Sequence, residues 1–445
     1  MRWEQQIQYA AISDIGFRRR NNQDAQAVRI ASDFETWKQR GHVLMVADGM
    51  GGHAVGELAS KIAVDTVPHA YLKDNDRELP SALRNAVETA NTAIFDRGMA
   101  NREFLRMGTT CTVLTLSRQG VVIGHVGDSR AYRIRGSRID QLTFDHSLQW
   151  ELIRQGHMKP EEVYLHEPRN VITRSLGPEP SIRVDIEGPF GVVAGDTYLL
   201  CSDGLTSHLR DDEIGMIAHE LPPGDACRLL VNLANLRGGS DNITVVISRV
   251  GPVPEGIAPE EPDTDSLNHA ADHGLSWQWL FAFWAVALLF AAGVCATLFG
   301  RPLFGGALVG SAIVGVGALV YFRLANRLER VPVETGGSET VIWRPYRSAS
   351  ARLTPAFLKQ LSVMESELQR TAVDEGWSID WAKHEQHFQK ARAAMNERKS
   401  RRALRAYAAA IDVLMAGIHL QRKQDKQDGR RSGRDDKTPI PPPKT

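Results

Sequence analysis

The sequence predicts an α/β fold for residues 1–250, followed by two apolar helices and an amphipathic helical region. Short runs rich in Val, Ile and Leu alternate with amphipathic stretches up to about Val250, which is typical of interleaved strands and helices. Two later runs, 276–300 and 303–322, contain no Asp, Glu, Lys or Arg. Beyond residue 350, apolar residues return at spacings of three and four, as in helices with one buried face.

Composition limits the class of protein and of partner. The 445 residues are 42% hydrophobic and 24% charged, which excludes a disordered or collagen-like chain. The 53 basic residues balance 53 acidic ones, so net charge gives no reason to expect nucleic acid as a partner. Four cysteines without a CxxC pair are too few for a disulfide framework or a Cys-rich zinc site. The N-terminus lacks the apolar run of a secretory signal, so we expect the first domain in the cytoplasm.

Residues 1–250 form the first predicted domain, and its elements follow from the period of the apolar residues. Continuous short apolar runs predict buried strands at 42–47, 121–126, 198–201 and 243–247. Apolar residues at spacings of three and four predict helices at 56–71 and 81–95. The alternation of the two patterns is what predicts the α/β class.

Residues 251–275 are rich in proline and acids and predict a linker, and residues 276–322 predict two transmembrane helices. The alternative is a pair of buried helices in a soluble core, but such helices are rarely apolar on every face. Arg323, Arg327 and Arg330 follow the second run and are expected on the cytoplasmic side. A tight turn at Arg301 would make a helical hairpin with both soluble parts on one side. The pairs Gly306 with Gly310 and Ser311 with Gly315 are expected to let the second helix pack closely on the first.

A second linker is expected at 323–350, a helical hairpin region at 351–421 and a disordered tail at 422–445. Two stripes of apolar residues, one around His384 and one from Leu404 to Ile418, predict two packed helices similar to one tetratricopeptide unit. A single unit cannot bury its own face, so it needs the preceding helix, a second copy or an unknown protein partner. His384 has no companion at metal-ligand spacing and is interpreted as a residue of the seam.

Four segments of the first domain place an aspartate at or beside the end of an apolar strand: Asp48, Asp128, Asp203 and Asp241. Any one of them alone is more typical of a turn. Together they can converge at the rim of a sheet, and carboxylates that converge repel one another unless a cation binds. Oxygen ligands of this kind favour magnesium or manganese. Gly49 would let a backbone carbonyl approach the metal.

A polar segment near the start, Arg19-Arg-Asn-Asn-Gln-Asp24, adds an arginine and another acid. A guanidinium beside a metal centre suits a phosphate monoester, because it can donate to two phosphate oxygens at once. Arg18 and Arg20 are equally well explained as residues of a solvated loop.

The motifs resemble those of the metal-dependent Ser/Thr protein phosphatase family, type 2C, in its bacterial form. The resemblance covers Tyr9 to about Val250 and consists of six segments in the order of the family: RRNNQD, DGMGGHAVGE, MGTT, GDSR, SDG and SDNI. It implies a sandwich of two mainly antiparallel sheets flanked by helices. The membrane spans and the C-terminal helices lie outside it.

The resemblance also implies the roles of the site residues and the cofactors, two Mn²⁺ or Mg²⁺ ions with a third possible. Asp48 would bridge the two metals, with the Gly49 carbonyl on one of them and Asp203 and Asp241 on the other. Arg19 would bind the phosphate. The remaining two acids would be peripheral, Asp24 holding a metal through water and Asp128 forming the third site with Asp203.

The implied reaction is hydrolysis of phosphoserine and phosphothreonine in proteins by a metal-activated water, opposing Ser/Thr kinases from a membrane anchor. The alternatives are a catalytically silent phosphoprotein-binding scaffold and a hydrolase of small phosphate esters. Two positions depart from the wider family: Met50 replaces a histidine proposed as the general acid, and Gln23 replaces a glutamate. His53 is close in sequence, and metal-bound water is another candidate acid. The substrate-facing flap is expected at 144–184.

Overall fold

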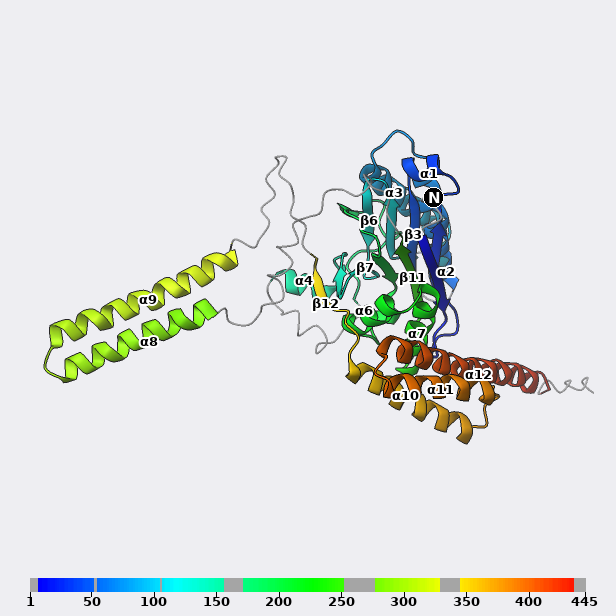
Figure 1. Ribbon diagram of the computed structural model, residues 1–445. Coiled ribbons are helices and arrows are strands. Elements are labelled where there is room, and N and C mark those ends of the chain that lie inside the picture. Colours follow the sequence, from blue (N-terminus) through cyan, green and yellow to red (C-terminus); the bar gives the residue numbers. More distant parts are fainter. Residues whose placement is uncertain are drawn as a thin grey trace, which may run out of the picture. The chain divides into compact units, whose positions relative to one another are not determined.

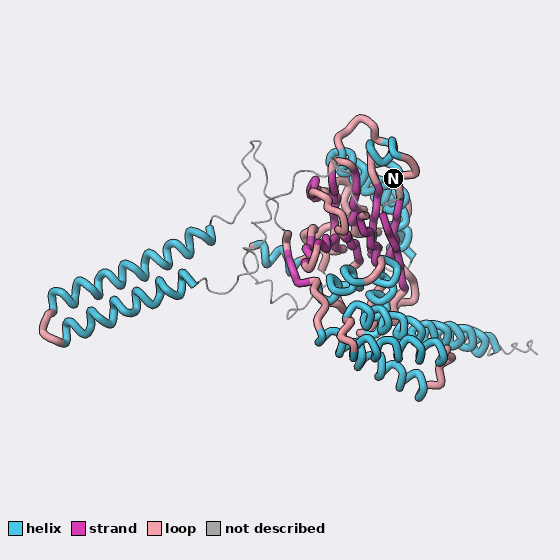
Figure 2. Tube along the Cα trace, viewed as in Figure 1, coloured by secondary structure: helices cyan, strands magenta, loops and turns pink. Residues whose placement is uncertain are grey.

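The computed structural model describes residues 7–51, 54–104, 106–155, 171–251, 277–328 and 345–435. The chain forms two compact units. Residues 1–260 and 343–445 together make the first unit, and residues 261–342 make the second. Figure 1 and Figure 2 show the sheets and most of the helices in the first unit and a separate pair of helices in the second.

Two antiparallel sheets form the centre of the first unit, which confirms the expected sandwich. The first sheet has the order β1 (Ile7–Asp14), β11 (Ile243–Val250), β10 (Thr197–Cys201), β7 (Arg130–Arg135), β8 (Arg138–Gln141) and β12 (Arg347–Ser350). The second has the order β2 (Asp24–Arg29), β3 (His42–Met50), β5 (Cys111–Ser117), β6 (Gly120–Val126) and β9 (Asp185–Phe190), with β4 (Gly108–Thr109) paired to β3.

The central strands are continuous apolar runs because both of their faces are buried. In β3, Leu44 and Val46 face the other sheet, whereas Val43 and Met45 pack in the core under the outer helices. The side chains of a strand alternate between its faces, so a strand between two cores has no polar face. This is why the four strands predicted from short apolar runs are all present.

Helices cover the outer faces of both sheets. On the second sheet these are α2 (Ala54–Lys73) and α3 (Leu79–Met99), and on the first α6 (Asp211–Glu220) and α7 (Pro223–Leu236). The shorter helices are α1 (Phe34–Gln39), the 3₁₀ turn η2 (Arg102–Phe104), α4 (Leu148–Arg154) and α5 (Asp203–Thr206).

The C-terminal region belongs to the same unit as the sheets. It consists of β12, α10 (Pro355–Asp374), α11 (Trp381–Asn396) and α12 (Ser400–Asp435). Strand β12 lies where the sequence predicted the end of a linker, and it pairs antiparallel with β8 from Arg347↔Gln141 to Ser350↔Arg138. The four residues of β12 carry no apolar alternation, so the strand forms only because β8 offers an unpaired edge.

The apolar stripe of α12 is buried within the chain. Leu404, Ile411 and Leu414 are fully buried and join one core with residues of α7, α10 and α11. The expectation of a separate protein partner for this stripe is therefore corrected, because α7 covers it. The helix also continues to Asp435, beyond the predicted end of the helical region at 421.

His384 lies in the seam of these helices, as predicted. Its side chain is fully buried and its Nε2 lies 2.7 Å from the Glu365 carboxylate of α10, which is also fully buried. The sequence pattern gave no sign of this partner, because Glu365 lies on a different helix from the histidine.

The second unit contains α8 (Trp277–Leu298) and α9 (Pro302–Leu328), joined by a tight turn. The two helices pack antiparallel at Gly293, where a Cβ would lie 2.8–3.0 Å from Val309 and the Gly305 carbonyl. Of the glycines expected at this contact, Gly315 lies there, since its Cβ would be 3.1 Å from Val286, whereas Gly306 and Gly310 face open space. The contact face of α9 therefore carries Gly305 and Gly315, so the prediction was right for Gly315 and wrong for Gly306 and Gly310.

In the part of the chain that the structure describes, one helical stretch meets the length and composition of a membrane span, Ser400–Arg422 of α12. It is 61% buried inside the fold, which is the property of a core helix. In α8 and α9 the apolar stretches formed by described residues are shorter, Val286–Leu298 and Pro302–Val316.

Candidate active site

Strand pairing brings the predicted acidic residues together at one edge of the sandwich. Asp24 begins β2 and lies directly opposite Asp48 of β3. Asp203 follows β10, and the neighbouring Ser202 hydroxyl donates to Asp24 Oδ2 at 2.7 Å. Asp128 follows β6. Residues from both sheets therefore meet where their strands end.

The turns that carry these acids are held by hydroxyl groups and close backbone contacts. The Thr110 hydroxyl accepts from the Asp48 N–H at 2.9 Å and lies 2.8 Å from the Ser129 hydroxyl, which links the two turns. Gly127 has φ +114°, and a Cβ there would lie 2.6 Å from Thr110. A Cβ on Gly49 would lie 2.1 Å from the Gly56 carbonyl. Neither glycine can be replaced without moving the acids.

The carboxylates at this edge repel one another, and the repulsion contributes to raised pKa values of Asp48, Asp24 and Asp203. Burial and the charges of Asp24, Asp203, Asp128 and Asp241 raise the pKa of Asp48 well above its usual range. Burial and neighbouring acids raise the pKa of Asp24 to about 7, although the Ser202 hydroxyl opposes the shift. Burial and Asp241 raise that of Asp203 to about 6. We call these five residues the acidic cluster.

The acidic cluster fits a bound cation. Buried oxygens of Asp24, Asp128 and Asp203 have no hydrogen-bond partner, and an unpaired buried acceptor is costly unless an ion or water satisfies it. Among the described residues, no three Asp, Glu, His or Cys side chains alone make a ready metal cage. Magnesium commonly takes one or two carboxylates and keeps several waters, so an all-oxygen site of this kind does not require such a cage.

Arg19 lies at the open side of the cluster. Its Nη2 is 2.6 Å from Asp241 Oδ2, and its side chain is 45% exposed. Asn242 holds the loop that carries Arg19, because its side chain donates to the Asn21 carbonyl at 3.0 Å and accepts from the Gln23 N–H at 2.8 Å. The predicted phosphate-binding arginine therefore lies beside a predicted metal ligand.

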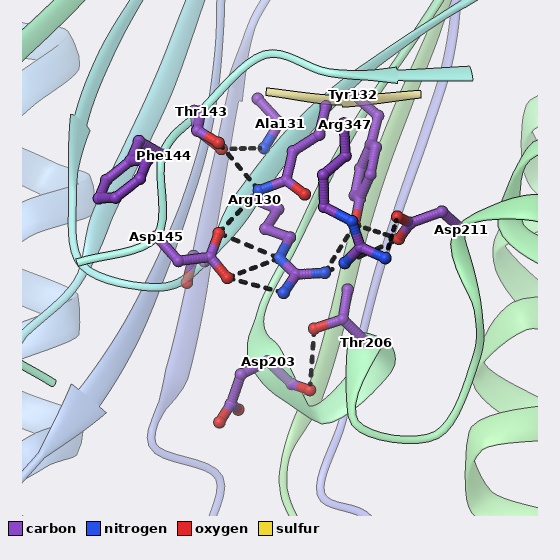
Figure 3. Close-up of polar contacts among 12 residues, drawn as sticks. Arg130, Ala131, Tyr132, Thr143, Phe144, Asp145, Asp203, Thr206, Asp211 and Arg347 are labelled. Atoms are coloured by element: carbon purple, nitrogen blue, oxygen red, sulfur yellow. Dashed lines mark hydrogen bonds and ion pairs between the residues drawn. The ribbon is translucent and has the colours of Figure 1, made fainter. Parts of the chain in front are cut away.

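A second group of buried charges adjoins the acidic cluster, and we call it the arginine-paired cluster (Figure 3). Arg130 donates to both oxygens of Asp145 at 2.7–3.0 Å and to the Tyr132 hydroxyl, which donates to Asp211 at 2.9 Å. Arg347 of β12 lies 3.6 Å from Asp211. The C-terminal region therefore contributes a charge next to the site.

The segment Asp145-His146-Ser147 contains the residue types of a catalytic triad but does not form one. Asp145 is paired with Arg130, whereas His146 Nδ1 accepts from the Gly127 N–H at 3.0 Å and its Nε2 lies 2.9 Å from Asp185. His146 instead braces the turn that carries Asp128. Residues 156–170 of the expected flap, and His53, lie outside the described residues.

Comparison with known proteins decides the family. The family model described as "Protein phosphatase 2C" matches residues 18–221. Protein phosphatase PhpP of Streptococcus pneumoniae is 36% identical over 248 residues, which cover 54% of this chain and 96% of that protein. The chain belongs to the protein phosphatase 2C family. Its enzyme class is thus the metal-dependent protein-serine/threonine phosphatases, as the motifs predicted.

Further phosphatases of this family show how far the likeness extends. Serine/threonine protein phosphatase PstP of Mycobacterium tuberculosis is 34% identical over 248 residues, 55% of this chain and 45% of that protein. A crystal structure of the PstP/Ppp phosphatase of the same organism matches with a TM-score of 0.50 and 33% identity, over 55% of this chain and 99% of that one. Each match covers little more than half of this chain.

Sequence reasoning missed the residues that support the acids. Ser202, Thr110 and Asn242 lie inside the motifs, so the motifs themselves were the available signal. Arg347 had no signal, since it is 136 residues from Asp211 along the chain (347 − 211) and within 4 Å of it only after folding.

Proposed function

We propose that this chain hydrolyses phosphoserine and phosphothreonine in cytoplasmic proteins and so opposes Ser/Thr kinases. The observation that carries the proposal is the acidic cluster, whose buried oxygens lack partners beside a half-exposed arginine. Metal ions bound there would supply a water of lowered pKa as the nucleophile. Asp48, the Gly49 carbonyl, Asp203 and Asp241 would hold two Mn²⁺ or Mg²⁺ ions. Asp24 would act through water, and Asp128 with Asp203 would hold a third ion.

The chain's own residues would bind and orient the phosphate. Arg19 can donate hydrogen bonds to two phosphate oxygens. The carboxylates of the acidic cluster would repel the phosphate unless a cation is bound at the site. Met50 lies in β3 next to the acids and has no proton to give. Protonation of the leaving oxygen would then fall to water at the site.

The test is phosphate release from a phosphothreonine peptide by the full-length protein in detergent. The full chain is used because the C-terminal region belongs to the same compact unit as the sheets. Release is expected with manganese and not with EDTA, and Asp203→Asn should abolish it. Release from p-nitrophenyl phosphate but from no phosphopeptide would favour a small-ester hydrolase. A folded, manganese-loaded protein inactive on both would favour the scaffold.

We further propose that α8 and α9 cross the membrane as a hairpin, with the rest of the described chain in the cytoplasm. Their large apolar side chains are widely exposed, for example Leu303 at 92% and Leu298 at 79%, which suits lipid and not water. Strand β12 pairs with β8, so the chain leaves the first unit after β11 and returns to it. If the apolar segment between these two points crosses the membrane, it has to cross an even number of times, because both of its ends join the same unit.

Site-specific labelling tests this arrangement. Cys295, the one exposed native cysteine, is first replaced by Ser. Arg301→Cys in the turn should then react with a membrane-impermeant maleimide in intact cells, whereas the exposed Ser366→Cys on α10 should react only after permeabilisation. Equal labelling of the two positions before permeabilisation would contradict the hairpin.

A further inference from the structure

The C-terminal helix α12 reaches the loop that carries the phosphate-binding arginine. Near the end of its buried stretch, the Arg422 guanidinium lies over the Phe17 ring with 4.3 Å to the centroid, and it donates to the Phe17 carbonyl. The His419 ring meets the same phenyl ring edge-on at 5.9 Å. Phe17 is two residues from Arg19, although 405 residues separate it from Arg422.

On the other side of the loop, the Asn242 side chain donates to the Ile15 carbonyl at 2.9 Å. Residues 18–20 are exposed, so they gain nothing from packing. The N–H groups of Phe17 and Arg18 both donate to the Gly239 carbonyl, at 2.9 and 3.0 Å. The Phe17 ring therefore lies between the loop that leads to Asp241 and the end of α12. The position of Phe17 in turn fixes the beginning of the exposed segment 18–20.

Helix α12 is itself fixed along its length. At its start Arg401 donates to the Glu220 carbonyl at the end of α6. In its middle Asp412 accepts from Asn232 of α7 at 3.3 Å and lies 3.7 Å from Arg228. A helix held at these points is a rigid support, and Arg422, which contacts Phe17, is the last residue of α12 whose side chain the structure describes.

We propose that Arg422, together with His419, is a positioning residue for the phosphate-binding loop. It holds Phe17 through its ring and its carbonyl, and so keeps Arg19 beside Asp241 where a phosphate would bind. The proposal rests on the proposed function for the role of Arg19. It assigns to the C-terminal region a part in substrate binding that residues 1–250 do not contain.

The test compares variants of the full-length, manganese-loaded protein. Arg422→Ala should raise the KM for p-nitrophenyl phosphate, and the inhibition constant of inorganic phosphate, by about three- to tenfold, with kcat changed less than about twofold. Arg422→Lys keeps a cation over the ring and should restore most of the affinity. The matched control is Arg405→Ala, an exposed arginine on the same helix, which should leave both constants unchanged.

A double-mutant cycle separates positioning from general packing. In an Arg19→Ala background, Arg422→Ala should add less than about twofold to KM, because the residue it positions is gone. An equal effect of Arg422→Ala in both backgrounds would overturn the proposal. So would a lowered melting temperature with unchanged KM and phosphate inhibition.

Amide hydrogen exchange of residues 15–20 gives a readout that does not need activity. Exchange in this segment should rise in Arg422→Ala and not in Arg405→Ala. If the wild-type protein released no phosphate, the proposed function would fail, while this measurement would still decide whether Arg422 holds the loop. Unchanged exchange would overturn the proposal.

Discussion

Two groups of buried carboxylates lie side by side in this protein, and they differ in the source of their counter-charge. In the arginine-paired cluster, Arg130 donates to both oxygens of Asp145 through Nε and Nη2, and Arg347 approaches Asp211. In the acidic cluster, Asp128 is buried and Asp48 is partly buried, burial and neighbouring acids raise the pKa values of both, and one buried oxygen of Asp128 has no hydrogen-bond partner.

The difference separates structure from function. A buried acid that is paired within the chain stabilises the fold as long as its partner stays. Buried acids that the chain leaves unpaired destabilise the protein until an external cation binds, and such groups gather at functional sites. Asp24, Asp48, Asp128 and Asp203 are therefore the acids whose removal should cost activity and not stability, whereas Asp241 is already paired with Arg19 at 2.6 Å.

The largest expected effect is on activity, from Asp48→Asn. Manganese-dependent phosphate release should fall by about 1,000-fold or more, because the implied bridging ligand is lost. In EDTA the variant should be at least as stable as the wild type, because one repelling carboxylate is gone. Urea unfolding in EDTA measures this. A clear loss of stability in EDTA would show that Asp48 also has a structural role and would break the comparison.

The opposite behaviour is expected of Arg130→Ala. It leaves Asp145 and Asp211 buried without their main cation, so the free energy of unfolding should fall by about 3–5 kcal/mol, as measured by urea unfolding with and without manganese. Arg370→Ala is the control, since its ion pair with Asp374 is exposed and should contribute little. If Arg130→Ala unfolded like the control, the two clusters would not differ in the way described.

The pH dependence of the metal-free protein should show the charge of the acidic cluster. Asp24 and Asp203 have pKa values raised from 3.8 to about 7 and about 6, so the folded protein keeps protons that the unfolded chain has released. The stabilisation that comes from these bound protons is complete below about pH 4 and is lost as the pH rises through 6 and 7. In EDTA the melting temperature should fall by a few degrees from pH 5 to 8.

Manganese should remove most of that fall near pH 8, since the ion replaces the protons as counter-charge. His42 is a background group with the opposite slope, because burial lowers its pKa to about 4, and it acts equally in all variants. Asp48→Asn is thus a suitable reference, and its melting temperature in EDTA should depend less on pH. An unchanged slope in Asp48→Asn would argue against repulsion as its cause.

The smallest effect is expected from Arg347→Ala. Its side chain is partly exposed and lies 3.6 Å from Asp211 and 5.9 Å from the Trp150 ring, so its loss should lower the free energy of unfolding by about 1 kcal/mol. Arg347→Lys should restore part of it. A loss as large as that of Arg130→Ala would mean that β12 is the main counter-charge of Asp211.

The sheets and the acids were predictable because their signals are local. Strands buried on both faces, such as β3 and β11, are continuous apolar runs, and each acid lies within two residues of the end or the start of a strand. The partners of these acids were harder to foresee, because hydroxyl groups like that of Ser202 contribute one hydrogen bond that no pattern marks. The face of α9 that meets α8 was predicted only in part, with Gly315 right and Gly306 and Gly310 wrong, since glycines lie on several faces of that helix.

The sequence by itself determined the α/β core, the family and the set of acids, because strand period and motif order depend on residues near one another in the chain. Only the tertiary structure decided that the C-terminal region belongs to the same unit. Strand β12 has no apolar alternation of its own, and the contacts of Arg347 with Asp211 and of Arg422 with Phe17 join residues far apart in sequence. Such pairings depend on which surfaces remain uncovered after the core has formed, and residue spacing carries no information about that.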